Sequence, residues 1–141
     1  MKESLTQEDH MGCGAACVAF TTNTTYKEAA RVLGAQKAKT TGYHLQELVD
    51  GLESFGLTSH FRHIRPKDTT TPYRSGAIVF IKRSKRYPYG HYLARHNNQW
   101  MDPWINLPFD KDLAHAKSGF RRRLPGKAQY VIFLSSAMLK R

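Results

Sequence analysis

The first half of the chain carries helix signals, which are an alanine-rich apolar stretch, capping residues and, over 45–55, apolar residues at helical spacing. The alanine-rich stretch over 13–21 predicts a first helix. A second helix is predicted over 25–34, where Thr24 and Thr25 offer an N-cap and Gly34 offers a stop. A third is predicted over 44–55, and the segment 37–42 between the last two is predicted to be a loop.

The second half changes to short apolar runs that are typical of strands. Strands are predicted at 57–64, 76–83, 90–95, 99–102 and 128–136, with a polar, proline-containing linker at 65–76. Helices followed by antiparallel strands indicate an α+β domain, with N-terminal helices packed on an antiparallel β-sheet. A length of 141 residues fits one domain over residues 1–141.

Composition supports a folded, non-membrane chain. Apolar residues make up 40% of it, and no run of eighteen predicts a transmembrane helix. The polar N-terminus lacks the apolar centre of a secretion signal, so we expect a cytoplasmic protein or an effector delivered by other means. The two cysteines, Cys13 and Cys17, are too few for a disulfide framework and are weak evidence for a metal site.

The formal charge of +11 is large for this length, and much of it lies in clusters at 62–67, 82–86 and 121–123. One interpretation is a solvated surface that keeps the protein soluble. The other is an acidic partner, which an acidic peptide, a nucleic acid or an anionic membrane would supply.

Cys13 carries the strongest chemical signal, because it lies between two glycines at the predicted start of the first helix. Unpaired amides and the helix dipole favour the thiolate there, and a thiolate is the nucleophile of cysteine catalysis. His91 begins a predicted strand, and Asp102 ends the next one along the chain. In a hairpin of these strands, the carboxylate would orient the imidazole and stabilise its charged form. The three residues predict a Cys-His-Asp triad.

Each candidate also has a structural interpretation. A cysteine near a helix start is usually a small core residue, which is our interpretation of Cys17. Taken alone, His91 is an ordinary strand residue, and Asp102 before a proline is a turn residue. We interpret His10 and His96 as surface residues. The tryptophans on either side of Asp102 belong to the core or wall the cleft.

These residues resemble a known family. The segment QEDHMGCGAACVAF is similar to the active-site segment of the papain-like cysteine peptidases that remove double-glycine leader peptides from bacteriocins. That family has a Gln six residues before its Cys, as Gln7 stands before Cys13. The HY pair at His91 and the dipeptide Asp102-Pro103 match the family's His and Asp, and the resemblance extends to about Pro103.

The resemblance implies a papain-like fold and a cysteine peptidase. Cys13 would attack the carbonyl, His91 would transfer the proton, and Asp102 would orient His91. Gln7 and the Cys13 backbone amide would stabilise the oxyanion. The substrate would be a peptide or protein with small residues or glycine before the cleaved bond, and the basic charge favours an acidic one. This chemistry needs no metal and no organic cofactor.

Two alternatives remain open at the level of sequence. In the first, a papain-like toxin or effector uses the same residues on RNA or on another acyl substrate, and the charge of +11 supports it. In the second, the domain binds a peptide or nucleic acid without catalysis. The complete set of four residues argues against the second alternative.

Overall fold

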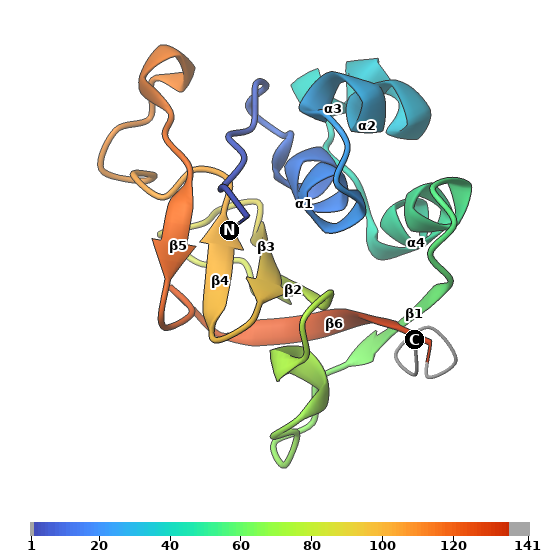
Figure 1. Ribbon diagram of the computed structural model, residues 1–141. Coiled ribbons are helices and arrows are strands. Elements are labelled where there is room, and N and C mark those ends of the chain that lie inside the picture. Colours follow the sequence, from blue (N-terminus) through green and yellow to red (C-terminus); the bar gives the residue numbers. More distant parts are fainter. Residues whose placement is uncertain (1, 136–141) are drawn as a thin grey trace.

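The computed structural model describes residues 2–135 and places four helices before six strands (Figure 1). The helices are α1 (Cys13–Thr22), α2 (Tyr26–Leu33), α3 (Ala35–Lys39) and α4 (Leu45–Ser54). The strands are β1 (Ser59–His63), β2 (Ile78–Ile81), β3 (His91–His96), β4 (Gln99–Asp102), β5 (Gly119–Arg121) and β6 (Ala128–Leu134). Short 3₁₀ helices lie in two loops, at Thr71–Tyr73 and Leu113–His115.

The strands form one antiparallel sheet in the order β1-β6-β2-β3-β4-β5. The last strand, β6, lies between β1 and β2, which explains its continuous apolar sequence. Its consecutive residues Val131 and Ile132 are both fully buried, although they point to opposite faces of the sheet. The helices pack on one face (Figure 1), so the α+β class and the packing of N-terminal helices on an antiparallel sheet are confirmed.

Capping residues set the helix boundaries close to the predicted ones. The Thr25 side chain accepts a hydrogen bond from the Glu28 amide at the start of α2. That helix ends at Gly34, whose φ of 107° few other residues adopt readily. At the start of α4 the Glu47 side chain accepts from the His44 amide, as in a capping box.

Two apolar clusters cover the two faces of the sheet. The inner cluster joins the helices to the sheet, with Leu48 and Ile78 among its fully buried members. The outer cluster lies on the opposite face and includes Leu93 and Trp100. Side chains alternate between the clusters along each strand, as Tyr92 and Leu93 do on β3. The strands are therefore buried on both faces in the middle of the sheet.

Two predictions of secondary structure need correction. The segment 37–42 was predicted to be a loop, but α3 occupies its first half because the chain restarts a helix after Gly34 and buries Ala38 completely. The strand β5 was not predicted, since three residues are too few to show an alternating pattern. The predicted strand end at residue 136 lies outside the described residues. None of the helices formed by residues 2–135 is long and apolar enough to cross a membrane.

Candidate active site

Cys13 is the first residue of α1, and its side chain is only partly buried. The glycines beside it allow close packing of this helix start. A Cβ atom on Gly12 would lie 2.0 Å from the Tyr26 hydroxyl oxygen, and one on Gly14 would lie 3.0 Å from a Leu48 methyl carbon. No side chain among residues 2–135 caps the helix, so its first amides remain available for an anion.

His91 and Asp102 form a buried pair. The imidazole Nε2 donates to Asp102 Oδ1 at 2.7 Å, and the two residues are 3% and 0% exposed. The hairpin register explains this contact. Ala94 pairs with Met101, so Asp102 falls opposite Leu93, one pleat from His91 on the same face of the sheet. The predicted juxtaposition of His91 and Asp102 is therefore present in the structure.

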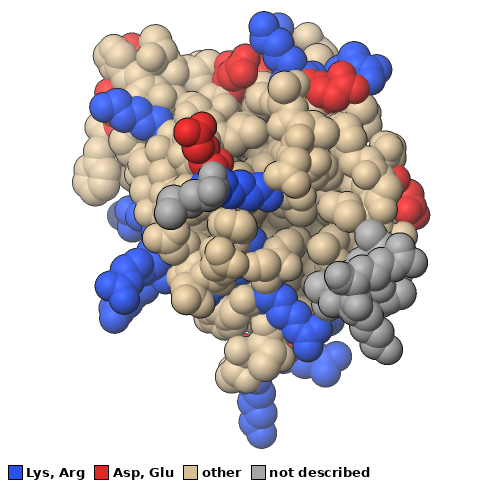
Figure 2. Space-filling view, viewed as in Figure 1, with Lys and Arg blue, Asp and Glu red and all other residues tan. Residues whose placement is uncertain are grey.

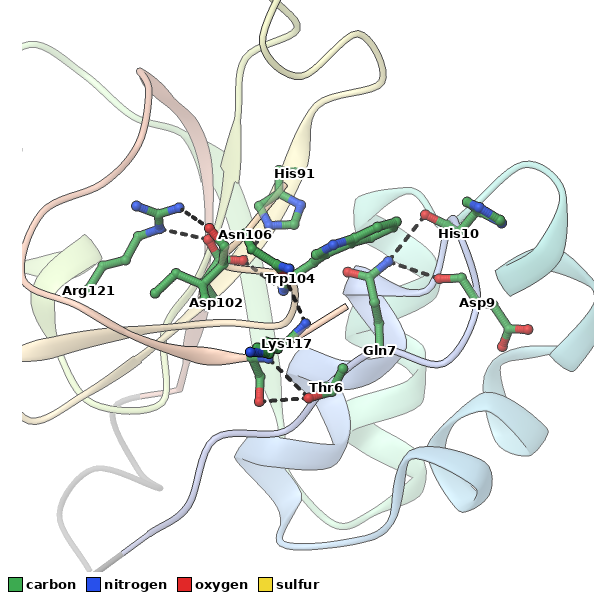
Figure 3. Close-up of polar contacts among 12 residues, drawn as sticks. Thr6, Gln7, Asp9, His10, His91, Asp102, Trp104, Asn106, Lys117 and Arg121 are labelled. Atoms are coloured by element: carbon green, nitrogen blue, oxygen red, sulfur yellow. Dashed lines mark hydrogen bonds and ion pairs between the residues drawn. The ribbon is translucent and has the colours of Figure 1, made fainter. Parts of the chain in front are cut away.

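Asp102 accepts hydrogen bonds from three groups (Figure 3). Besides His91, the Trp104 amide donates to Oδ1 at 3.0 Å and Arg121 Nε donates to Oδ2 at 2.7 Å. Arg121 also donates through Nη2 to the Ile105 carbonyl at 3.0 Å. Burial alone raises the pKa of Asp102, but the bonds from His91, Arg121 and Trp104 outweigh it and lower that pKa. The carboxylate is therefore ionised at neutral pH.

His91 is held in its charged form. Burial alone lowers the pKa of an imidazole, but the hydrogen bond with Asp102 and the nearby Cys13 side chain raise the pKa of His91 to about 10. The Tyr87 ring stacks on the imidazole, with centroids 4.9 Å apart and planes 5° apart. Tyr87 therefore fixes the orientation of the ring and covers one of its faces.

Gln7 lies close to the site, with its side chain 3% exposed. Its backbone amide donates to the Pro103 carbonyl at 3.2 Å, which ties the N-terminal segment to the end of β4. Its side-chain Nε2 donates to the carbonyls of Asp9 and His10, at 2.9 and 3.2 Å (Figure 3). The Oε1 atom has no hydrogen-bond partner within residues 2–135. In this conformation Gln7 shapes the turn before Cys13, and both its N–H groups are already used.

Gln7, Cys13 and His91 line one cavity of about 100 Å³. Aromatic side chains from Tyr43, Tyr87, Tyr89, Tyr92 and Phe80 wall it, with Gly42 and Gly90 between them. A wider groove of about 570 Å³ adjoins it and shares Thr41, Gly42, Tyr43, Phe80, Tyr89 and Tyr92 with it. The arrangement offers a thiol, an imidazolium and free helix amides beside a narrow slot that opens into a larger groove.

The other residues considered from the sequence, Cys17, His10, His96 and Trp104, differ in burial. Cys17 is fully buried, and burial raises the pKa of its thiol. His10 is exposed but lines the small cavity, while His96 is partly buried with its ring against Phe20. Trp104 is 2% exposed, with its ring 6.0 Å from that of His10. It is therefore buried beside the site.

Sequence reasoning missed Arg121 and Tyr87. Arg121 was grouped with a surface cluster of arginines, yet its guanidinium holds the buried carboxylate. The pairing of β5 with β4 brings the two together, and no local pattern reveals it. Among residues 2–135, no three His, Cys, Asp or Glu side chains converge on a possible metal position.

Comparisons with known proteins find similarity among solved structures. No protein-family model matches the chain, and no curated protein sequence matches it. The chain is similar in structure to the peptidase domain of Streptococcus mutans ComA, at 19% sequence identity and a TM-score of 0.46. The alignment covers 96% of this chain and 99% of that domain.

Proposed function

We propose that this chain is a cysteine peptidase with Cys13 as nucleophile, His91 as acid and base, and Asp102 as the residue that orients His91. The observation that carries the proposal is the buried His91–Asp102 pair, 2.7 Å apart, of which His91 lines the same cavity as Cys13 at the start of α1. An ionised carboxylate, an imidazolium and a thiolate in this order form the arrangement of an activated cysteine.

The reaction follows from these positions. The Cys13 thiolate adds to the peptide carbonyl, and the carbonyl oxygen takes up negative charge beside the first amides of α1. His91 gives its proton to the leaving amine as the C–N bond breaks, which leaves an acyl group on the sulfur. A water molecule, deprotonated by the now neutral His91, attacks the thioester and restores the thiolate and the imidazolium.

Gln7 is proposed as a second oxyanion donor, together with the Cys13 amide. Its buried position beside the cavity supports this role, but its Nε2 currently bonds two backbone carbonyls. The longer of these bonds, 3.2 Å to the His10 carbonyl, is the one that it would exchange for the oxyanion.

The shape of the cleft supports a substrate with small residues before the cleaved bond. The cavity beside Cys13 has a volume of only about 100 Å³ and is walled by tyrosines, so it has little room for a large side chain. Lys37, His44, Arg83 and Glu47 line the wider groove next to it. Glu47 pairs with Lys37 and lies 3.2 Å from His44, so Arg83 is the lining cation that suits an acidic segment of the peptide.

Hydrolysis of a peptide library, read by mass spectrometry of the new N-termini, tests this function. The wild-type chain should release products after glycine or other small residues, and Cys13→Ala should release none. Cys17→Ala, which removes only a buried thiol, is the matched control and should retain cleavage. Cleavage by Cys13→Ala, or no cleavage of any library peptide by the folded wild type, would reject the proposal.

A further inference from the structure

Charge is divided unequally between the two halves of the chain. Residues 1–53 carry five Lys or Arg and seven Asp or Glu, a net charge of −2. Residues 54–135 carry fifteen Lys or Arg and four Asp or Glu, a net charge of +11. Figure 2 shows the consequence on one face, where the visible acidic side chains lie in the upper half and Lys and Arg dominate the lower half. The sheet and its loops therefore form a strongly positive side of the molecule.

A hollow of about 690 Å³ on this side concentrates cations that lack partners. It lies between the loops 64–73 and 122–128, against the outer apolar cluster. It shares no lining residue with the cavity at Cys13. Four side chains line it with positive charge: Arg65, Arg122, Arg123 and Lys127. None of them forms an ion pair with a carboxylate of residues 2–135.

The acidic residue that lines this hollow, Asp68, is already paired with a cation. Its carboxylate accepts two hydrogen bonds from Arg62, at 2.7 and 2.9 Å, and one from the Arg65 amide at 2.6 Å. Those bonds lower the pKa of Asp68 to about 2, so it stays ionised and committed to them. The four cations therefore face solvent without compensation, which favours an anionic ligand.

An aromatic surface adjoins these cations. Tyr73 lines the hollow and is 48% exposed. The guanidinium of Arg95 lies over the rings of both Tyr73 and Trp100, at 5.3 and 4.9 Å. A half-exposed tyrosine side chain beside unpaired cations offers an aromatic group on which a nucleobase can stack while the phosphates bind the cations.

The cationic surface continues over the turn between β3 and β4. A second hollow, of about 760 Å³, is lined by Asn97, Asn98, Gln99, Arg122 and Arg123. Arg122 and Arg123 line both hollows, so the two hollows adjoin. We call the two hollows together the path. The amides of this turn supply donors and acceptors that hydrogen-bond to bases, sugars and phosphates.

We propose that this path, formed by the loops 64–73 and 122–128 and the turn 97–99, binds single-stranded nucleic acid. Arginine guanidinium groups match the geometry of phosphates, and an exposed tyrosine stacks on unpaired bases. The side-chain amides can hydrogen-bond to any base, so binding should not depend on the nucleotide sequence. An acidic peptide would use the cations but would make no use of the exposed part of the Tyr73 ring. The path is separate from the cleft at Cys13, so it binds whether or not the chain cleaves peptides.

Fluorescence anisotropy with a labelled oligouridine of about 12 nucleotides, a length within the usual range of single-strand sites, tests the proposal. Four cations on four phosphates predict that affinity falls about 50-fold between about 50 and about 200 mM salt. The triple variant Arg122→Gln, Arg123→Gln, Lys127→Gln should lose most of the binding. The control Lys27→Gln, Lys85→Gln, Lys111→Gln removes the same charge from exposed positions outside the path and should bind like wild type.

Tyr73→Leu keeps an apolar side chain but removes the stacking face, and it should weaken binding about fivefold or more. Thermal melting of each variant confirms that it is folded. Three results would overturn the proposal: no binding of the oligonucleotide at low salt, equal weakening by both triple variants, or tighter binding of an oligoglutamate of equal charge. The last result would assign the path to acidic polypeptides instead.

Discussion

Arg121 defines the site at the scale of single residues, because it neutralises a carboxylate that is 0% exposed. Arg121→Met would leave Asp102 with one partner fewer in a buried position, and breaking such a pair destabilises by about 3 kcal/mol or more. Thermal unfolding measures the loss. Arg122→Met is the matched control, because the side chain of Arg122 is exposed and forms no ion pair within residues 2–135. Equal melting temperatures for the two variants would contradict a structural role of Arg121.

The ionisation of His91 predicts how stability depends on pH. The pKa of His91 is raised from 6.5 to about 10 in the folded chain, so its contribution is complete below pH 6.5 and is lost as the pH rises through 10. The pKa of Asp102 is lowered, so its contribution is lost when the pH falls below its ordinary range near 3.8. The difference in melting temperature between wild type and His91→Gln should therefore shrink steadily from pH 6.5 to pH 10. A constant difference would show that His91 is neutral in the folded chain.

Gln7 predicts a kinetic effect at the same scale. Once a cleaved peptide is known, Gln7→Ala should lower kcat by roughly 10²–10³ with little change in KM, as the loss of one oxyanion donor does. Because Nε2 also holds the Asp9 and His10 carbonyls, the melting temperature should fall as well. A lower melting temperature with unchanged kcat would leave Gln7 as a structural residue of the turn.

At the scale of secondary-structure elements, Gly90 sets where β3 begins. Its φ is 75°, and a Cβ atom there would lie 2.1 Å from the Phe80 ring. Gly56 has a similar φ of 87°, but a Cβ atom there would meet nothing within 4 Å, so Gly56→Ala is the matched control. Gly90→Ala should lower the melting temperature more than Gly56→Ala and should also slow alkylation of Cys13, because it displaces His91. Equal effects on both measurements would show that the start of β3 adapts freely.

The same elements show what the sequence could reveal. An alanine-rich stretch located α1, a threonine cap and a terminal glycine located α2, and helical periodicity located α4. Each lay within a few residues of its predicted bounds, because those signals are local. The hairpin of β3 and β4 was readable from its short turn, and with it the meeting of His91 and Asp102. By contrast, β5 is three residues long, and Arg121 reaches Asp102 from 19 positions away. The Gln7 amide orientation depends on backbone carbonyls that only the folded turn positions.

At the scale of the whole molecule, the unequal distribution of charge affects stability. Residues 54–135 carry a net charge of +11, so their Lys and Arg side chains repel one another. Salt screens this repulsion, because charges farther apart than the Debye length, about 10 Å at 0.1 M, interact only weakly. Raising the salt concentration should therefore raise the melting temperature. The triple variant at 122, 123 and 127 should respond less than the variant at 27, 85 and 111. The same response in both would show that the charge is too dispersed to act locally.

The central claim is that His91 and Asp102 activate Cys13. Iodoacetamide alkylation of Cys13 at pH 6, followed by peptide mass spectrometry, tests it most directly, because an ordinary thiol is almost fully protonated at that pH. In the native chain, Cys13 should react on the order of tenfold faster than in the urea-unfolded chain, and His91→Gln should abolish that difference. A native rate no higher than the unfolded rate, or a rate unchanged in His91→Gln, would contradict the account.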